Sequence, residues 1–256
     1  MTTAVAQDVE VGIIGAGLMG REVAAALARW PALLEHPVRP RLTGVCDTNP
    51  AALEWFDRID TVRFKATDHR QLMKDDGIEV LYIAVPHHLH EELYLDAIAA
   101  GKDLLGEKPF GIDLPACERI VDALRRRRGL FARCSSEMPY FPGAQLALDV
   151  IGSGAVGRIV EARSAFLHSS DLDVTKTINW KRQARFCGRL GVMGDLGMHV
   201  LHVPLRLGWH PARVYAVLQD IVRERPDPNG ELKPCDTLDN ATLVCSVESS
   251  DGPFPL

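Results

Sequence analysis

Short apolar runs alternate with longer segments of helical periodicity along the first half of the chain. The apolar runs lie at residues 9–14, 41–46, 78–85, 102–105 and 130–134, and the helical patterns at residues 18–30, 90–100 and 114–127. The run at 78–85 is almost continuously apolar, as expected for a strand buried on both faces. Strands that alternate with helices predict βαβ units on a parallel sheet. We therefore expect a doubly wound, Rossmann-type α/β domain over residues 1–135.

A glycine motif joins the first predicted strand to the first predicted helix. It reads G-x-G-x-x-G, with glycines at Gly15, Gly17 and Gly20 and with Leu18 and Met19 between the last two. In a dinucleotide-binding turn the first glycine permits the tight turn, the second allows the backbone to approach a pyrophosphate, and the third permits close packing. The helix N-terminus adds free N–H groups and partial positive charge. The position therefore predicts a dinucleotide site, with a ligand-free glycine turn as the alternative.

An acidic residue, Asp47, follows the second predicted strand. A carboxylate at this position in a Rossmann domain typically accepts hydrogen bonds from the ribose hydroxyls of NAD. It would also repel the 2′-phosphate of NADP, although a nearby arginine can compensate. The sequence therefore favours NAD as the cofactor, with NADP as the weaker alternative.

Polar residues also follow the strands at 78–85 and 102–105, in the segments AVPHHLH and GEKP. Ligands bind beyond the carboxyl ends of the strands in an open α/β sheet. We therefore place Pro86, His87, Glu107 and Lys108 on the cofactor's side. There the Lys108 ammonium would stabilise a developing alkoxide. The alternatives are a solvated surface lysine at Lys108 and a metal cluster of the neighbouring histidines, and no metal is predicted.

A carboxylate and an imidazole lie four residues apart at Asp195 and His199 in the segment GRLGVMGDLGMHVLHV. On a helix, positions i and i+4 share one face, so the two groups are expected to act together on one hydroxyl. His202 is expected to pack or form hydrogen bonds within its own domain. The alternatives are a metal site that includes His202 and a simple ion pair on the helix surface.

Composition and charge exclude several classes of partner. The 256 residues carry a formal net charge of −5, which argues against nucleic-acid or anionic-membrane binding. The six cysteines contain no C-x-x-C pair, so neither a zinc knuckle nor a disulfide framework is indicated. Residues 1–8 resemble no signal peptide, and no apolar run approaches the roughly 18 residues of a membrane span. A cytoplasmic protein is expected.

Taken together, these motifs resemble the Gfo/Idh/MocA family of NAD(P)-dependent oxidoreductases. The segment GAGLMG with Asp47 is similar to the family's dinucleotide motif, and AVPHHLH, which ends at His90, is similar to its P-N-x-x-H segment. GEKP resembles its E-K-P signature, and GVMGDLGMH resembles its G-G-x-x-x-D-x-G-x-H motif. The chain departs from the family pattern at His87, where asparagine is usual, and at Val192 and Met193, where glycine is common.

The resemblance implies a function and site residues. Lys108, Asp195 and His199 would be catalytic, Trp180 and Lys181 would face the substrate, and His87 and His90 would contact the cofactor. The expected reaction is hydride transfer between NAD and a hydroxyl-bearing carbon of a sugar, inositol or related polyol. The alternatives are NAD-assisted glycoside cleavage and a non-catalytic NAD-binding sensor.

The resemblance also implies that residues 136–256 form an α+β domain for substrate binding and oligomerisation, built on a mostly antiparallel sheet. Residues 211–218 and 240–247 have the pattern of two of its strands. Family members usually continue well beyond this point, and VESSDGPFPL lacks the alternation needed to extend the sheet. We therefore expect this domain to be incomplete: the chain would be a fragment, be completed by a partner, or fold a reduced domain. If the sheet is complete, a homo-oligomer through it is expected.

Overall fold

The structure is a computed structural model that describes residues 7–33 and 36–256. The chain divides into two compact units, residues 1–135 and residues 136–256. The expectation of no targeting segment rests on residues 1–8, of which residues 1–6 lie outside the described part. Within the described ranges, no helix combines the length and the apolar character that crossing a bilayer would require.

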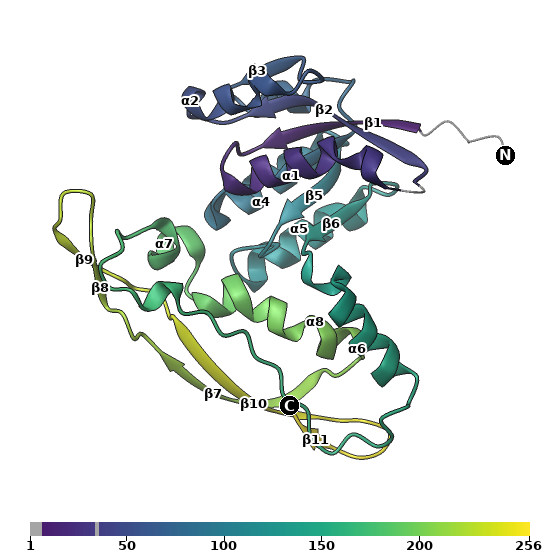
Figure 1. Cartoon of the computed structure of the whole chain (residues 1–256), viewed down its shortest axis with the longest axis vertical. Coiled ribbons are helices and arrows are strands. Elements are labelled where there is room, and N and C mark those ends of the chain that lie inside the picture. The colour runs from purple at the N-terminus through teal and green to yellow at the C-terminus, as the bar shows by residue number, and fades with distance from the viewer. Residues whose placement is uncertain (1–6, 34–35) are drawn as a thin grey trace. The chain divides into compact units, whose positions relative to one another are not determined.

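The first unit is built on a six-stranded sheet in which every pairing is parallel. Its strands are β1 (Gln7–Ile14), β2 (Val38–Cys46), β3 (Phe64–Ala66), β4 (Val80–Ile83), β5 (Asp103–Glu107) and β6 (Ala132–Ser135). They follow the spatial order β3-β2-β1-β4-β5-β6 (Figure 1). This is the order of a doubly wound Rossmann sheet, in which the strand order reverses between β1 and β4. The predicted α/β fold is therefore confirmed.

Helices connect these strands and cover the sheet. They are α1 (Leu18–Ala28), α2 (Pro50–Leu53), α3 (Arg70–Met73), α4 (His90–Ala99) and α5 (Leu114–Arg126), with 3-10 turns η1 (Trp30–Ala32), η2 (Glu54–Arg58) and η3 (His87–Leu89). Asp113 caps α5, because its side chain accepts the Ala116 N–H at 2.8 Å. Helix α4 ends before Gly101, whose φ of 77° suits a helix C-terminus.

Two hydrophobic cores lie on opposite faces of the sheet, because successive strand residues point to opposite sides. Ile13 and Tyr82 belong to the core that includes Ala24 of α1 and Phe56 of η2. The next residue, Ile14, belongs to the other core, which contains buried residues of α4 and α5. Burial on both faces explains why the central strands are almost continuously apolar in sequence.

Strands β2 and β3 are two of the places where the first unit departs from the sequence pattern. Strand β2 begins three residues before the predicted run, where Val38, Arg39 and Pro40 pair with β1. Strand β3 was not predicted, because three residues are too few to show a period. Its backbone nevertheless pairs with β2 through Gly44 and Phe64.

The second unit carries antiparallel sheets. Strands β7 (Pro211–Gln219), β10 (Asn240–Val247) and β11 (Phe254–Pro255) form one, and β8 (Glu224–Pro226) pairs with β9 (Leu232–Pro234) in the other. Its helices are α6 (Pro142–Gly152), α7 (Ala184–Cys187) and α8 (Met198–Arg206), with 3-10 turns η4 (Met138–Tyr140), η5 (Ser170–Leu172) and η6 (Trp180–Arg182) and a π-helical turn η7 (Met193–Gly197). Figure 1 shows β7 and β10 running side by side.

The segment VESSDGPFPL does contribute to the sheet, and the expectation that it would not was wrong. Its strand β11 pairs with β10 through Phe254 and Val247. Backbone pairing and one buried ring hold this short strand in place, so no alternating pattern is required. Phe254 is 3% exposed, and its ring meets the Trp209 ring edge-on. Apolar side chains of β7 and β10, such as Tyr215 and Val244, are more than half exposed. Oligomerisation through this sheet stays a prediction.

Candidate functional site

The glycine motif forms a tight turn between β1 and α1. Gly15 has a φ of 105°, and a Cβ atom there would collide with the Ala84 carbonyl at the end of β4. A Cβ atom at Gly20 would collide with the Gly15 carbonyl, so α1 packs closely on the turn. A Cβ atom at Gly17 would meet no atom within 4 Å, so the backbone there is open to a ligand. Helix α1 begins at Leu18 and directs its unpaired N–H groups toward this end. The turn therefore fits a dinucleotide pyrophosphate.

Asp47 follows β2 directly beside this turn. Its Oδ2 accepts the Ala16 N–H at 2.8 Å, and its Oδ1 accepts the Asn49 N–H at 2.8 Å. The backbone adds a further link, because the Gly15 N–H donates to the Cys46 carbonyl at 2.8 Å. The carboxylate thus lies where a Rossmann ribose ligand is expected, and it also contacts the glycine turn.

The residues after β4 are largely buried. His87 lies in η3 and is 3% exposed, and Pro86 precedes it. His90 begins α4 with 0% exposure, and its Nδ1 and Nε2 lie 2.7 Å and 2.9 Å from the Pro109 and Val85 carbonyl oxygens. His90 therefore links the segments that follow β4 and β5, and its contact with the cofactor stays a prediction.

The protonation state of His90 follows from its burial. Burial lowers the pKa of His90; the two carbonyl acceptors oppose this shift, and the charges of His88 and Lys108 add to it. A neutral imidazole has one N–H, so His90 donates to one carbonyl at a time. The ring stacks on Tyr94 with centroids 5.1 Å apart, which fixes its plane.

Glu107 and Lys108 end β5 at the same edge of the sheet as the glycine turn. Glu107 is 7% exposed, and its Oε1 accepts the Tyr82 hydroxyl at 2.6 Å. Its Oε2 accepts the Lys108 N–H at 3.1 Å, and its carbonyl accepts the Tyr94 hydroxyl at 2.8 Å. Glu107 thereby fixes the backbone from which the half-buried Lys108 side chain projects. We interpret Glu107 as a residue that positions Lys108.

Lys181 and Asp195 form an ion pair within the second unit, with 2.8 Å between Nζ and Oδ2. The turn η6, which carries Trp180 and Lys181, is held from several sides. Asn179 caps it by accepting the Lys181 N–H at 2.9 Å, and the Lys181 carbonyl accepts the Cys187 thiol at 3.0 Å and the Thr237 hydroxyl at 3.1 Å. Burial raises the pKa of Cys187 to about 11, so this thiol remains a neutral donor.

Asp195 and His199 do not share one regular α-helix, which corrects the geometry expected from their spacing. Asp195 lies in the π-helical turn η7, and His199 lies in α8 directly after it. Such turns are rare and occur frequently at functional sites. The His199 ring lies 6.0 Å from the Phe166 ring, measured between centroids. His202 bonds within its own unit as predicted, with its Nε2 2.6 Å from the Ser136 Oγ.

Two buried arginines, one of them in η6, were not predicted from the sequence. Arg225 is 1% exposed, and it donates to the backbone carbonyls of Asp171 and Asp173. Arg182, at 7% exposure, pairs with the Asp171 carboxylate. These contacts join strand β8 and the 171–173 segment to the turn that carries Lys181. Arg225 lies 54 residues from Asp171 in the chain, and the three charges belong to no motif.

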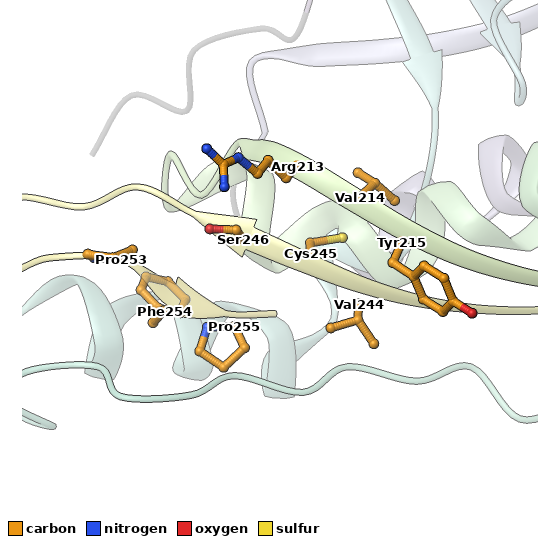
Figure 2. Close-up of a pocket in the computed structure, with 9 residues that line it drawn as sticks. All are labelled: Arg213, Val214, Tyr215, Val244, Cys245, Ser246, Pro253, Phe254 and Pro255. Atoms are coloured by element: carbon orange, nitrogen blue, oxygen red, sulfur yellow. The ribbon is translucent and has the colours of Figure 1, made fainter.

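A surface groove of the second unit lies along β7, β10 and β11 (Figure 2). It is lined by Arg213, Val214, Tyr215, Val244, Cys245, Ser246, Pro253, Phe254 and Pro255. Arg213 is the one charged residue among the nine that line it, and burial raises the pKa of the Cys245 thiol. Asp195 and His199 are not among these residues, so the groove is separate from the predicted chemistry.

Two family models match the chain. The model described as an oxidoreductase family with an NAD-binding Rossmann fold covers residues 9–132, and the GFO/IDH/MocA C-terminal domain covers residues 144–250. Together they match most of both units. The family resemblance read from the motifs is therefore confirmed.

Several proteins of similar sequence and structure are dehydrogenases. Levoglucosan dehydrogenase of Pseudarthrobacter phenanthrenivorans is 30% identical over 252 residues, covering 96% of this chain and 61% of that protein. Trans-1,2-dihydrobenzene-1,2-diol dehydrogenase of Mus musculus is 29% identical over 189 residues, covering 73% of this chain and 53% of that protein. The structure of levoglucosan dehydrogenase in complex with NADH and L-sorbose matches with a TM-score of 0.87 at 28% identity, covering 97% of this chain and 66% of that one.

The chain thus spans between 53% and 61% of the lengths of these two curated relatives. Both units take part in the matches, since the aligned structure covers 97% of the chain. On the two family models, the chain belongs to the Gfo/Idh/MocA family of oxidoreductases, and its first unit is that family's NAD-binding Rossmann domain.

Proposed function

We propose that this chain is part of an NAD-dependent oxidoreductase that transfers a hydride between the nicotinamide and a hydroxyl-bearing carbon of a sugar, inositol or related polyol. The observation that carries the proposal is the edge of the first sheet, where the open glycine turn at Gly17 and the ammonium-bearing Lys108 both follow strand ends. The names of the levoglucosan and dihydrodiol dehydrogenases support a substrate with hydroxyl groups.

The proposed chemistry needs a base, an orienting group and a stabilising charge. The nicotinamide ring, when bound, supplies the hydride acceptor. His199 takes the proton of the substrate hydroxyl, and Asp195 orients the base or the substrate. The Lys108 ammonium stabilises negative charge that develops on the substrate oxygen. The carbon that loses its hydride becomes a carbonyl, so protons and electrons balance.

Two further assignments concern binding. Asp47 favours NAD over NADP, because a carboxylate repels a 2′-phosphate and accepts from ribose hydroxyls. Trp180 and Lys181 face the substrate in this proposal. The Lys181 Nζ lies 5.7 Å from the Trp180 ring centroid, so an aromatic face and an ammonium group lie close together in η6.

Binding and turnover should be measured separately. A fluorescence titration with NADH and NADPH tests the cofactor, and NADH formation from NAD with levoglucosan, inositol and simple sugars tests the reaction. Net NADH formation with at least one of these substrates is expected. Binding without turnover on any of them would overturn the catalytic proposal and favour a sensor. Cleavage of a glycoside without net NADH would favour transient oxidation followed by elimination.

A further inference from the structure

Both backbone polar groups of Ala16, in the middle of the glycine turn, are bound by charged side chains. The Ala16 N–H donates to the Asp47 Oδ2 at 2.8 Å. The Ala16 carbonyl accepts from the Arg21 Nε at 3.1 Å. Ala16 itself is 0% exposed. The peptide group before Ala16 is therefore held by an acidic side chain, and the peptide group after it by a basic one.

These two contacts determine how the next N–H group is directed. A trans peptide is planar, so the Gly17 N–H points opposite to the Ala16 carbonyl. Because Arg21 holds that carbonyl, the Gly17 N–H faces away from the guanidinium group. The backbone at Gly17 is open, since a Cβ atom there would meet nothing within 4 Å. The turn thus presents an oriented donor at the place where its backbone is accessible.

Each charged side chain is itself anchored. The Asp47 Oδ1 accepts the Asn49 N–H at 2.8 Å, which orients the carboxylate from the β2 end. The Arg21 guanidinium lies over the Trp55 ring, with Cζ 5.8 Å from the centroid. Arg58 lies over the same ring at 5.0 Å, but its described contact is with Trp55 alone. The glycine turn is therefore tied to β2 through Asp47 and to η2 through Arg21.

We propose that Asp47 and Arg21 are positioning residues for the dinucleotide, which hold the glycine turn so that the Gly17 N–H is directed toward the diphosphate before the cofactor arrives. The inference rests on the proposed function and deepens it. A glycine turn without these contacts would lose conformational freedom on binding, and that loss weakens affinity. The role of Asp47 thus extends beyond the ribose, and it applies to any ligand with the same diphosphate.

A matched pair of ligands separates this role from ribose recognition. We would titrate NADH and an NADH analogue whose adenosine ribose lacks both hydroxyls, using wild type, Asp47→Asn, Arg21→Met and the control Arg58→Met. Asparagine has an NH2 group in place of one carboxylate oxygen, so it cannot reproduce both the Oδ2 contact with Ala16 and the Oδ1 contact with Asn49. Asp47→Asn and Arg21→Met should each weaken binding of the analogue without ribose hydroxyls by about tenfold, the scale of one lost hydrogen bond. Arg58→Met should change the affinity of neither ligand by more than about twofold.

A second readout needs no ligand. In the free protein, Asp47→Ala should raise the amide exchange rate of Ala16 by about tenfold or more, because the N–H loses its acceptor, while the amides of β1 keep their rates. The inference is overturned if Asp47→Asn weakens NADH binding but leaves binding of the analogue without ribose hydroxyls unchanged. It is also overturned if Asp47→Ala does not raise the amide exchange rate of Ala16. A wild-type protein that binds neither NADH nor NADPH would instead overturn the proposed function, and this inference with it.

Discussion

Lys181 and Asp195 are ion-paired across fourteen residues of sequence, with Nζ and Oδ2 2.8 Å apart. The Lys181 side chain is 41% exposed and the Asp195 side chain 17%, so the pair reaches solvent from the lysine end. The backbone of Lys181 is held by Asn179, Cys187 and Thr237. The lysine is therefore well placed to hold the Asp195 carboxylate in one orientation.

Lys181→Met is expected to lower kcat for polyol oxidation by about tenfold, because Asp195 loses the group that orients it. Lys181→Arg should retain more activity, since it keeps the charge. Steady-state kinetics would separate this orienting role of Lys181 from a substrate-binding role, in which KM would rise and kcat would stay the same. Lys176→Met, at an exposed lysine of the same segment, is the control and should behave as wild type.

NADH should bind more tightly than NADPH, because the Asp47 carboxylate beside the glycine turn repels a 2′-phosphate. Paired fluorescence titrations under identical salt conditions measure the two dissociation constants. Equal or tighter binding of NADPH would mean that Arg21 and Arg58, both stacked on Trp55, outweigh the carboxylate.

Lys108→Ala should remove most turnover and leave NADH affinity within a few-fold of wild type. A group that stabilises charge only in the transition state affects kcat more than ground-state binding. Titration and turnover would be measured on the same preparation. If affinity falls together with turnover, Lys108 holds the cofactor instead.

His199→Asn should reduce oxidation by about 10²–10⁴-fold, the usual contribution of a general base. NADH binding should be little changed, because a general base acts on the substrate hydroxyl. His202→Asn is the comparison, since His202 bonds to Ser136 within its unit. Equal losses in both variants would point to a structural effect on α8.

The free energy of unfolding should fall as the solution is acidified below about pH 6.5, the ordinary histidine pKa. Burial lowers the pKa of His90 in the folded state, so the unfolded chain takes up the proton first and acid favours unfolding. His90→Gln should reduce this slope by up to about 1.4 kcal/mol per pH unit. Urea denaturation at several pH values measures it.

The first unit could be read from sequence because its signals are local. A strand buried on both faces must be apolar throughout, and a helix covering it must repeat its apolar positions every turn. Gly15 is required because its φ is positive, and Gly20 because its backbone lies close to the Gly15 carbonyl, five residues earlier in the chain. Where an element is too short to repeat, as in β3 and β11, the pattern carried no signal.

The sequence by itself determined the alternation of the longer strands and helices in the first unit, the place of the glycine turn, and the residue types at the strand ends. Tertiary structure alone decided that Asp47 and Arg21 hold Ala16, that Lys181 pairs with Asp195, that Arg225 is buried against the 171–173 segment, and that Asp195 lies in a π-helical turn. Except for Arg21 and Ala16, these partners lie 14 to 54 residues apart, so their contacts depend on how whole segments pack. A periodic pattern records which face of an element is buried, and it carries no information about which distant side chain that face will meet.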